Sequence, residues 1–212
     1  RIRANYAASV ARGSLHEAEA ARRLSLILPS TDFGSAAGDD LVIEAVFEDL
    51  PLKQSIFRDL EAICGPGATL ATNTSALDVD AIAEGLMHPG RFVGMHFFSP
   101  ANVMKLCEVV KARTTDAATL ATAVATAKAI GKIPVVSGNC DGFIGNRMVA
   151  KRSAQAEKLL QEGALPREVD DAIRSFGFPM GPLQTNDMSG LDVGYAIRKR
   201  RGTRFVIADS LV

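Results

Sequence analysis

The sequence has few cysteines, no excess of either charge and no long apolar run, and each of these features excludes some classes of protein. Cysteines are few, and Cys64, Cys107 and Cys140 stand alone without a CxxC spacing, which argues against a disulfide framework or a zinc site and favours a reducing compartment. Neither sign of charge is in excess, because 24 basic residues balance 24 acidic ones, so nucleic acid is not an expected partner. Apolar runs stay well short of the roughly 20 residues that a membrane helix requires, so we expect no membrane insertion.

The 212 residues do contain a regular alternation of extended and helical patterns. Such alternation is typical of a mainly parallel sheet with helices on its faces. Strands are expected at 24–28, 41–47, 68–73, 91–98, 105–110 and 132–137. From the GNCDG segment onward the pattern is helical only. We therefore predict an α/β domain over residues 1–137 and an all-α domain over residues 138–212.

Local signals add detail to the first half of this domain. Ser14 with Glu17 three residues later forms a capping-box pattern, which predicts a helix from that point to about Leu24. The LVIEAVF run at 41–47 is continuously apolar, as expected of a strand buried on both faces. Asp49, followed closely by a proline, marks the start of the next helix.

Two ionisable residues stand inside apolar strands of this sheet, His96 in GMHFF and Glu108 in KLCEVV. A buried carboxylate is costly unless it is paired. If 91–98 and 105–110 form an antiparallel hairpin, His96 lies opposite Glu108. A carboxylate beside an imidazole fixes its tautomer and stabilises its charged form, which suits a catalytic base. The alternative is a structural histidine whose hydrogen bonds are satisfied.

Further polar residues follow the ends of strands, where ligands bind in open parallel sheets. Asn73 and Ser75 come directly after an apolar strand, although an ordinary turn that caps the next helix would use the same residues. Glu48 and Lys53 follow another strand, and their alternative is a first-turn acid with a solvated lysine. Asn146 lies near the start of the first helix of the second domain, where the helix dipole favours negative charge. Its alternative is a surface asparagine.

These residues fall in sequence blocks that together resemble the L-3-hydroxyacyl-CoA dehydrogenase family. The blocks are TNTSALDVDAIA, GMHFFSPANVMKLCEVV, DGFIGNRMVA, EGALPREVDDAI and FGFPMGPLQTNDMSGLDVGYAIRKR. They run over nearly the whole chain, and they are most similar to the dehydrogenase part of multifunctional fatty-acid β-oxidation enzymes. The resemblance implies a Rossmann-like NAD-binding domain followed by a helical domain that completes the acyl-CoA site.

The resemblance also implies roles for the catalytic candidates. His96 would take the hydroxyl proton of a 3-hydroxyacyl-CoA while hydride leaves C3 for NAD, and Glu108 would orient His96. Ser75 would hydrogen-bond the reacting oxygen, and Asn146 would hold the substrate near His96. No metal is implied.

Four further positions match cofactor contacts of the family. Glu48 and Lys53 would lie near the ribose and nicotinamide of NAD, together with Asn73 and Ser99. Some family members carry asparagine at the position of Ser99.

The resemblance stops at the front of the chain. Family members bind the pyrophosphate of NAD through a G-x-G-x-x-G loop after the first strand, and this motif occurs nowhere in the sequence. We therefore expect an α/β fold in which the Rossmann-like domain lacks its first strands and its glycine-rich loop and the helical domain is incomplete at its end. Such a chain is expected to bind NAD poorly on its own.

Other functions and contexts stay open. The chain could be a non-catalytic remnant that binds acyl-CoA or mediates dimerisation, or a dehydrogenase of a small 3-hydroxy acid. The expected partners are an acyl-CoA substrate and either a second copy, in a homodimer, or the other domains of a larger multifunctional chain. The alanine- and arginine-rich composition favours a bacterial cytoplasm, with the peroxisome as the alternative.

Overall fold

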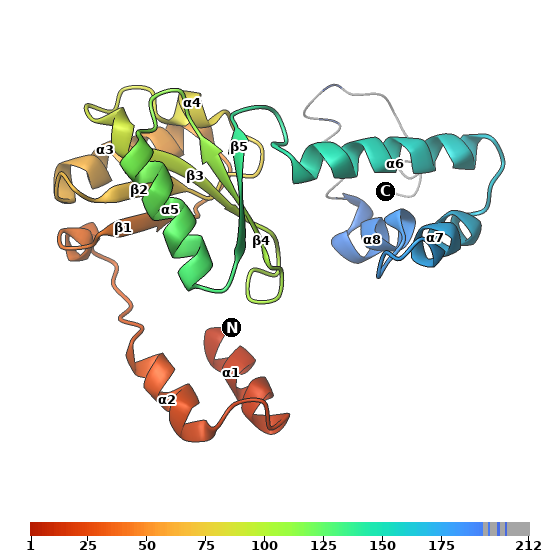
Figure 1. Cartoon of the computed structure of the whole chain (residues 1–212), viewed down its shortest axis with the longest axis horizontal. Helices are drawn as coiled ribbons and strands as arrows, with labels where there is room; N and C mark the ends of the chain where they lie inside the picture. Colours follow the sequence, from red (N-terminus) through yellow and green to blue (C-terminus); the bar gives the residue numbers. More distant parts are fainter. Residues whose placement is uncertain (193–194, 196–198, 200–201, 203–212) are drawn as a thin grey trace.

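A five-stranded sheet forms the centre of the first half of the chain (Figure 1). The computed structural model describes residues 1–192, 195, 199 and 202. The strands are β1 (Leu41–Glu44), β2 (Thr69–Thr72), β3 (Phe92–Phe97), β4 (Leu106–Lys111) and β5 (Ile133–Gly138). They lie side by side in sequence order, and every pair is parallel except β3 with β4. The carboxyl ends of β1, β2 and β3 therefore share one edge of the sheet.

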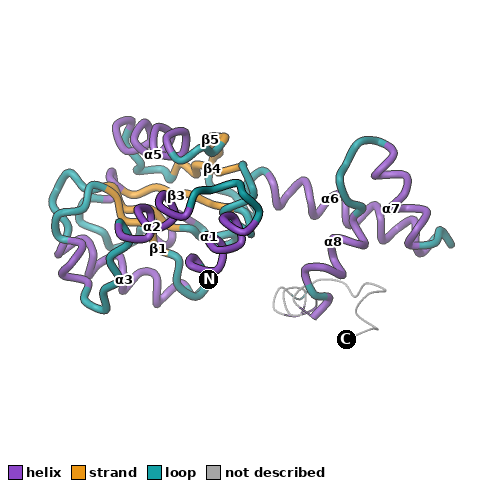
Figure 2. The backbone as a smooth tube through the Cα atoms, turned by 90° about the horizontal axis from the view of Figure 1, so that it is seen from below, coloured by secondary structure: helices purple, strands orange, loops and turns teal. Residues whose placement is uncertain are grey.

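Helices cover the two faces of the sheet, with α3 (Leu50–Ile63) on one face and α5 (Ala117–Ala129) on the other (Figure 2). The short helix α4 (Val79–Ile82) packs into the same core as α3. Neighbouring strand residues point to opposite faces, so the sheet separates two cores. The first core joins Phe57 of α3 to Leu70 and Phe92 of the sheet, and Phe57 and Phe92 meet edge to face. The second packs Ala123 of α5 against Val93 and other sheet residues.

The second half of the chain is helical, as predicted, with α6 (Gly145–Gln161), α7 (Pro166–Ser175) and α8 (Pro182–Ser189). These helices lie to one side of the sheet, and α6 leads away from it (Figure 1). The buried Asp170 of α7 accepts hydrogen bonds from the backbone N–H groups of Leu183 and Gln184, which open α8. Gly181 lies so close to this carboxylate that a Cβ atom would overlap it.

Two helices precede the sheet, α1 (Ile2–Ala11) and α2 (Glu17–Ser25), followed by the short 3₁₀ turn η1 (Phe33–Ala36). Two details of this region differ from the sequence prediction. The predicted capping box is wrong, because the Ser14 hydroxyl donates to the carbonyl of Ser9 and α2 begins only after His16. The strand predicted at 24–28 is also absent, and Leu28 is 87% exposed there. An apolar segment becomes a strand only beside another strand, and no described strand lies next to this one.

β1 is shorter and more open than its sequence suggested. It ends at Glu44 instead of continuing to residue 47, and Ile43 and Phe47 are exposed. The prediction of a strand buried on both faces is wrong, because β1 is an edge strand with only β2 beside it. A second 3₁₀ turn, η2 (Pro89–Arg91), leads into β3. In the part of the chain that the structure describes, no helix combines the length and the apolar character needed to cross a membrane.

Candidate functional site

His96 and Glu108 form a buried pair in the antiparallel hairpin of β3 and β4. They are directly opposite in the ladder, which confirms the register expected from the sequence. The Nδ1 atom of His96 lies 2.7 Å from Oε2 of Glu108. His96 is 5% exposed and Glu108 is fully buried. An ionised carboxylate can only accept hydrogen bonds, so Nδ1 donates and the lone pair of Nε2 is left for a substrate.

The second oxygen of Glu108 holds the start of the helical half of the chain. Oε1 accepts hydrogen bonds from the backbone N–H groups of Ile144, at 2.9 Å, and Gly145, at 2.7 Å. These groups open α6, where unpaired N–H donors favour a negative charge. Glu108 therefore joins three parts of the site: β4, His96 and α6. Sequence reasoning did not find the contact with α6, because no local pattern relates positions so far apart in the chain.

Two aromatic rings lie next to His96. The ring centroid of Phe98 lies 4.4 Å from that of His96, and the ring of Phe143 lies 5.7 Å away. Phe143 is buried and has a φ of 47°, a region that non-glycine residues seldom occupy and that is often found at functional sites. A Cβ atom on Gly145 would come within 2.7 Å of the Phe98 ring. This glycine therefore lets the start of α6 approach Phe98 and Glu108 closely.

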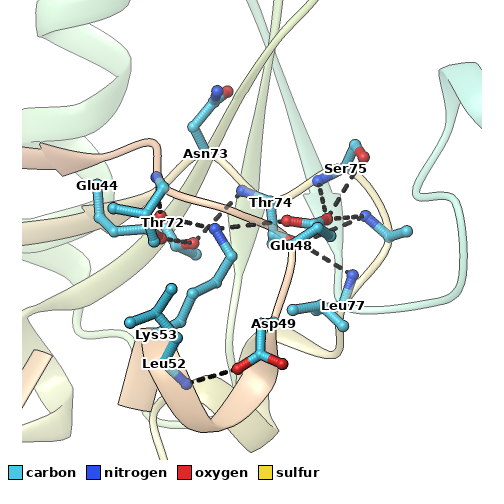
Figure 3. A network of polar contacts seen from close by, with 12 residues as sticks. Glu44, Glu48, Asp49, Leu52, Lys53, Thr72, Asn73, Thr74, Ser75 and Leu77 are labelled. Carbon is cyan, nitrogen blue, oxygen red and sulfur yellow. Dashed lines mark hydrogen bonds and ion pairs between the residues drawn. The ribbon is translucent and has the colours of Figure 1, made fainter. Parts of the chain in front are cut away.

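Glu48 organises the loop that carries Ser75 (Figure 3). Its Oε1 atom accepts from the Thr74 hydroxyl at 2.6 Å and from the backbone N–H groups of Ser75, at 2.9 Å, and Ala76, at 3.1 Å. Partial burial opposes ionisation of Glu48, but these hydrogen bonds and the nearby charge of Lys53 outweigh it and lower its pKa below the usual value. The loop is thus held by a carboxylate that stays ionised.

Lys53 lies in a buried ion-pair network beneath this loop (Figure 3). Its ammonium is 2.6 Å from Oε1 of Glu44 and 3.4 Å from Oε2 of Glu48. The hydroxyl of Thr72 donates to the other oxygen of Glu44. Lys53 is 1% exposed, so it connects α3 to the ends of β1 and β2. The sequence did not point to Glu44 or Thr72.

The remaining candidates occupy different places around the strand ends. Asn73 points away from Lys53 (Figure 3), and its side-chain oxygen accepts from the backbone N–H of Phe97 at 2.9 Å, which ties the end of β2 to the end of β3. Asn146 donates to the carbonyl of Ser75 at 3.1 Å and so brings α6 to the Ser75 loop. Ser99 is exposed, two residues beyond β3.

Polar groups at the shared carboxyl edge of β1, β2 and β3 fit one half of a dinucleotide. An ionised Glu48, the hydroxyl of Ser75 and the amide of Asn73 offer acceptors and donors for a sugar and an amide. The pyrophosphate half needs a glycine-rich loop at the start of a helix, and the sequence contains no such motif. The residues present therefore suit the nicotinamide end of NAD.

Comparison with known protein families identifies both halves of the chain. Residues 1–140 match the family model of the 3-hydroxyacyl-CoA dehydrogenase NAD binding domain, which indicates NAD as the cofactor. Residues 142–209 match the C-terminal domain of the same family. The finer domain boundary near residue 137 stays a prediction.

Curated relatives are much longer than this chain. The peroxisomal bifunctional enzyme of Cavia porcellus is 50% identical over 178 residues, which cover 82% of this chain and 24% of the relative. A peroxisomal fatty acid β-oxidation multifunctional protein of Arabidopsis thaliana is 42% identical over 196 residues, 92% of this chain and 27% of the relative. The chain thus spans about a quarter of the length of these relatives.

Solved structures show the same fold. A 3-hydroxybutyryl-CoA dehydrogenase from Escherichia coli superposes with a TM-score of 0.88 at 40% identity, over 92% of this chain and 42% of that one. The dehydrogenase part of a multifunctional enzyme from C. elegans gives a TM-score of 0.68 at 34% identity, over 95% of this chain and 47% of that one. The family models and these relatives together show that the chain belongs to the 3-hydroxyacyl-CoA dehydrogenase family.

Proposed function

We propose that this chain supplies the catalytic residues of an NAD-dependent L-3-hydroxyacyl-CoA dehydrogenase of fatty-acid β-oxidation. The observation that carries the proposal is the buried pair of His96 and Glu108, in which Nδ1 is engaged at 2.7 Å and Nε2 is left as the basic atom. Such a pair suits removal of a proton from an alcohol.

The reaction divides into a proton transfer and a hydride transfer. Nε2 of His96 accepts the hydroxyl proton of the substrate, and Glu108 stabilises the imidazolium that results. The side-chain amide of Asn146 donates to the carbonyl of Ser75, so the two residues lie next to each other. The Ser75 hydroxyl orients the reacting oxygen, and Asn146 orients the thioester. Glu48, Asn73 and Ser99 would hold NAD at the strand ends, where the cofactor would supply the acceptor for the hydride from C3. The product is a 3-ketoacyl-CoA.

The cofactor candidates divide into direct and indirect roles in this proposal. Glu48, Asn73 and Ser99 line the strand ends and contact the ribose and nicotinamide. Lys53 acts indirectly, since its buried ammonium is already held by Glu44 and Glu48. Its role is to keep Glu48 ionised and in place beneath the Ser75 loop.

The relatives also bear on partners and location. Their length agrees with a place for this segment in a larger multifunctional chain. The curated relatives described above are peroxisomal by name, so we propose the peroxisome in preference to the bacterial cytoplasm. An acyl-CoA substrate and a homodimer formed through the helical half complete the proposal.

Activity is best tested in a completed chain. We define this as residues 1–212 joined to the parts of the dehydrogenase region that flank the matching segment in the Cavia porcellus relative. NADH formation is followed with 3-hydroxybutyryl-CoA and with free 3-hydroxybutyrate. We expect turnover of the CoA ester only. Turnover of the free acid would favour the small-acid alternative, and acyl-CoA binding without turnover would favour a non-catalytic remnant.

A further inference from the structure

A short linker, residues 139–144, connects β5 to α6, and its first residue is fixed by three hydrogen bonds. The Nδ2 atom of Asn139 donates to Oδ1 of Asp78 at 2.6 Å and to Oδ2 of Asp80 at 2.8 Å. Its Oδ1 atom accepts from the backbone N–H of Val79 at 3.2 Å. Two carboxylates face the nitrogen and one N–H faces the oxygen, so chemistry fixes the orientation of this amide.

The segment that Asn139 contacts is the one that leads from the Ser75 loop into α4. Asp78 caps α4 by accepting from the backbone N–H groups of Asp80 and Ala81. The hydrogen bond from Asn139 is the main cause of a lowered pKa at Asp78, and partial burial opposes it. Asn139 thus binds a cap that is already formed and adds to its stability.

The far end of the linker is fixed at the catalytic pair. Phe143 is buried in the core beside His96. Ile144 donates its N–H to Glu108, and Asn146, just beyond the linker, donates to the Ser75 carbonyl. Residues from 75 to 80 are therefore held at both ends by residues from the start of the helical half.

We propose that Asn139 is a positioning residue that sets the start of α6, and through it Asn146, relative to His96. The proposal rests on the proposed dehydrogenase function, because Asn146 is a substrate contact only there. An amide suits the task because it bridges two carboxylates and an N–H without adding charge. A flexible linker at this place would let α6 shift, and small displacements of a catalytic group lower rates strongly.

Hydrogen exchange on the 212-residue chain tests the positioning directly. In Asn139→Ala we expect the amides of Ile144 and Gly145 to exchange about tenfold faster, since their local opening becomes easier, while amides of β2 and β3 keep their rates. Arg113→Ala is the matched control. Its side chain approaches the same Asp80 at 3.5 Å but is 85% exposed. Unchanged exchange at residues 144 and 145 in Asn139→Ala would overturn the proposal.

A double-mutant cycle in the completed chain tests the catalytic consequence. We expect Asn139→Ala to lower kcat about tenfold, with an unchanged pH profile because His96 and Glu108 remain paired. In Asn146→Ala the further loss from Asn139→Ala should almost vanish. Additive effects on kcat, or normal turnover in Asn139→Ala, would contradict the proposal. A completed wild-type chain without dehydrogenase activity would instead refute the proposed function, and the exchange result would still decide the positioning role.

Discussion

At the scale of single residues, Glu108 makes the most consequential contacts of the site. One oxygen engages His96 and the other engages the first two N–H groups around the start of α6. A buried carboxylate is costly unless its oxygens are hydrogen-bonded, and both oxygens of Glu108 are. The same side chain therefore orients the imidazole and fixes the approach of the helical half.

Replacement of Glu108 by glutamine separates these two tasks. The glutamine carbonyl can still accept from Ile144 and Gly145, but its N–H group would then face Nδ1 and place the imidazole proton on Nε2. We expect turnover of the completed chain to fall by about 10²-fold or more. Nitrogen NMR of the imidazole in the 212-residue chain reports the tautomer.

Glu61→Gln is a suitable control for this variant. Glu61 also accepts from two backbone N–H groups, those of Met87 and His88, but its ionic partner is Arg91 instead of His96. The turnover per folded molecule of the Glu61→Gln variant should equal that of the wild type. A Glu108→Gln protein with normal turnover and its proton on Nδ1 would contradict the role given to Glu108.

The lowered pKa of Glu48 predicts that the stability of the folded chain depends on pH. Its pKa is lowered in the folded chain, so the unfolded chain binds the proton more readily. The stabilisation is therefore complete above the ordinary glutamate pKa of about 4.3, and it is lost as pH falls through the lowered value. Urea unfolding should show a stability difference between wild type and Glu48→Gln that is largest near neutral pH and shrinks on acidification.

Glu84→Gln provides the comparison for this pH dependence. Glu84 is exposed on the turn after α4, and its replacement should leave the acid side of the stability profile as in the wild type. An equal change in both variants would mean that the hydrogen bonds of Glu48 do not stabilise the fold.

At the scale of helices and strands, the sequence predicted four of the five strands well but not the extent of β1 or the structure of the segment before it. The strands β2, β3, β4 and β5 were expected within about two residues of their observed ends, because each is a local apolar run between turn signals. Whether β1 and the segment at 24–28 form buried strands depends on which strands lie beside them, and the local sequence pattern carries no information about neighbouring strands. The wrong predictions for these two segments therefore have one cause.

The site was predictable to the extent that it follows from strand geometry. His96 and Glu108 could be paired because a hairpin fixes which residues face each other. Contacts of Glu108 with Gly145, or of Asn139 with Asp78, join residues far apart in the chain through their tertiary positions. No sequence pattern marks such contacts.

The connection of α7 to α8 gives a test at this scale. Asp170 is buried and accepts from two backbone N–H groups of α8. Hydrogen bonds to a charged group contribute about 1.5–3 kcal/mol, so Asp170→Ala should destabilise α8 by about 2 kcal/mol, measured by hydrogen exchange of its amides. The neighbouring Asp171 forms exposed ion pairs with Arg167 and Arg174. Asp171→Ala should therefore change the exchange little, and equal effects of the two variants would refute the capping role.

At the scale of the whole molecule, we propose that the chain holds one part of a dinucleotide site and most of a catalytic site. In this proposal the carboxyl edge of β1, β2 and β3 binds the nicotinamide end of NAD, and the start of α6, which is hydrogen-bonded to Glu108, completes the surroundings of His96. The glycine-rich motif that would bind the pyrophosphate is absent from the sequence. We therefore expect calorimetry to find weaker NAD binding by the 212-residue chain than by the completed chain.

The catalytic role of His96 is tested by the turnover of His96→Gln in the completed chain, measured by NADH formation with 3-hydroxybutyryl-CoA, together with the affinity of the variant for NAD. A general base of this kind contributes about 10²–10⁴-fold. We predict a fall in kcat of at least about 10²-fold with unchanged NAD affinity. Near-normal turnover would show that His96 is a structural histidine and not the catalytic base.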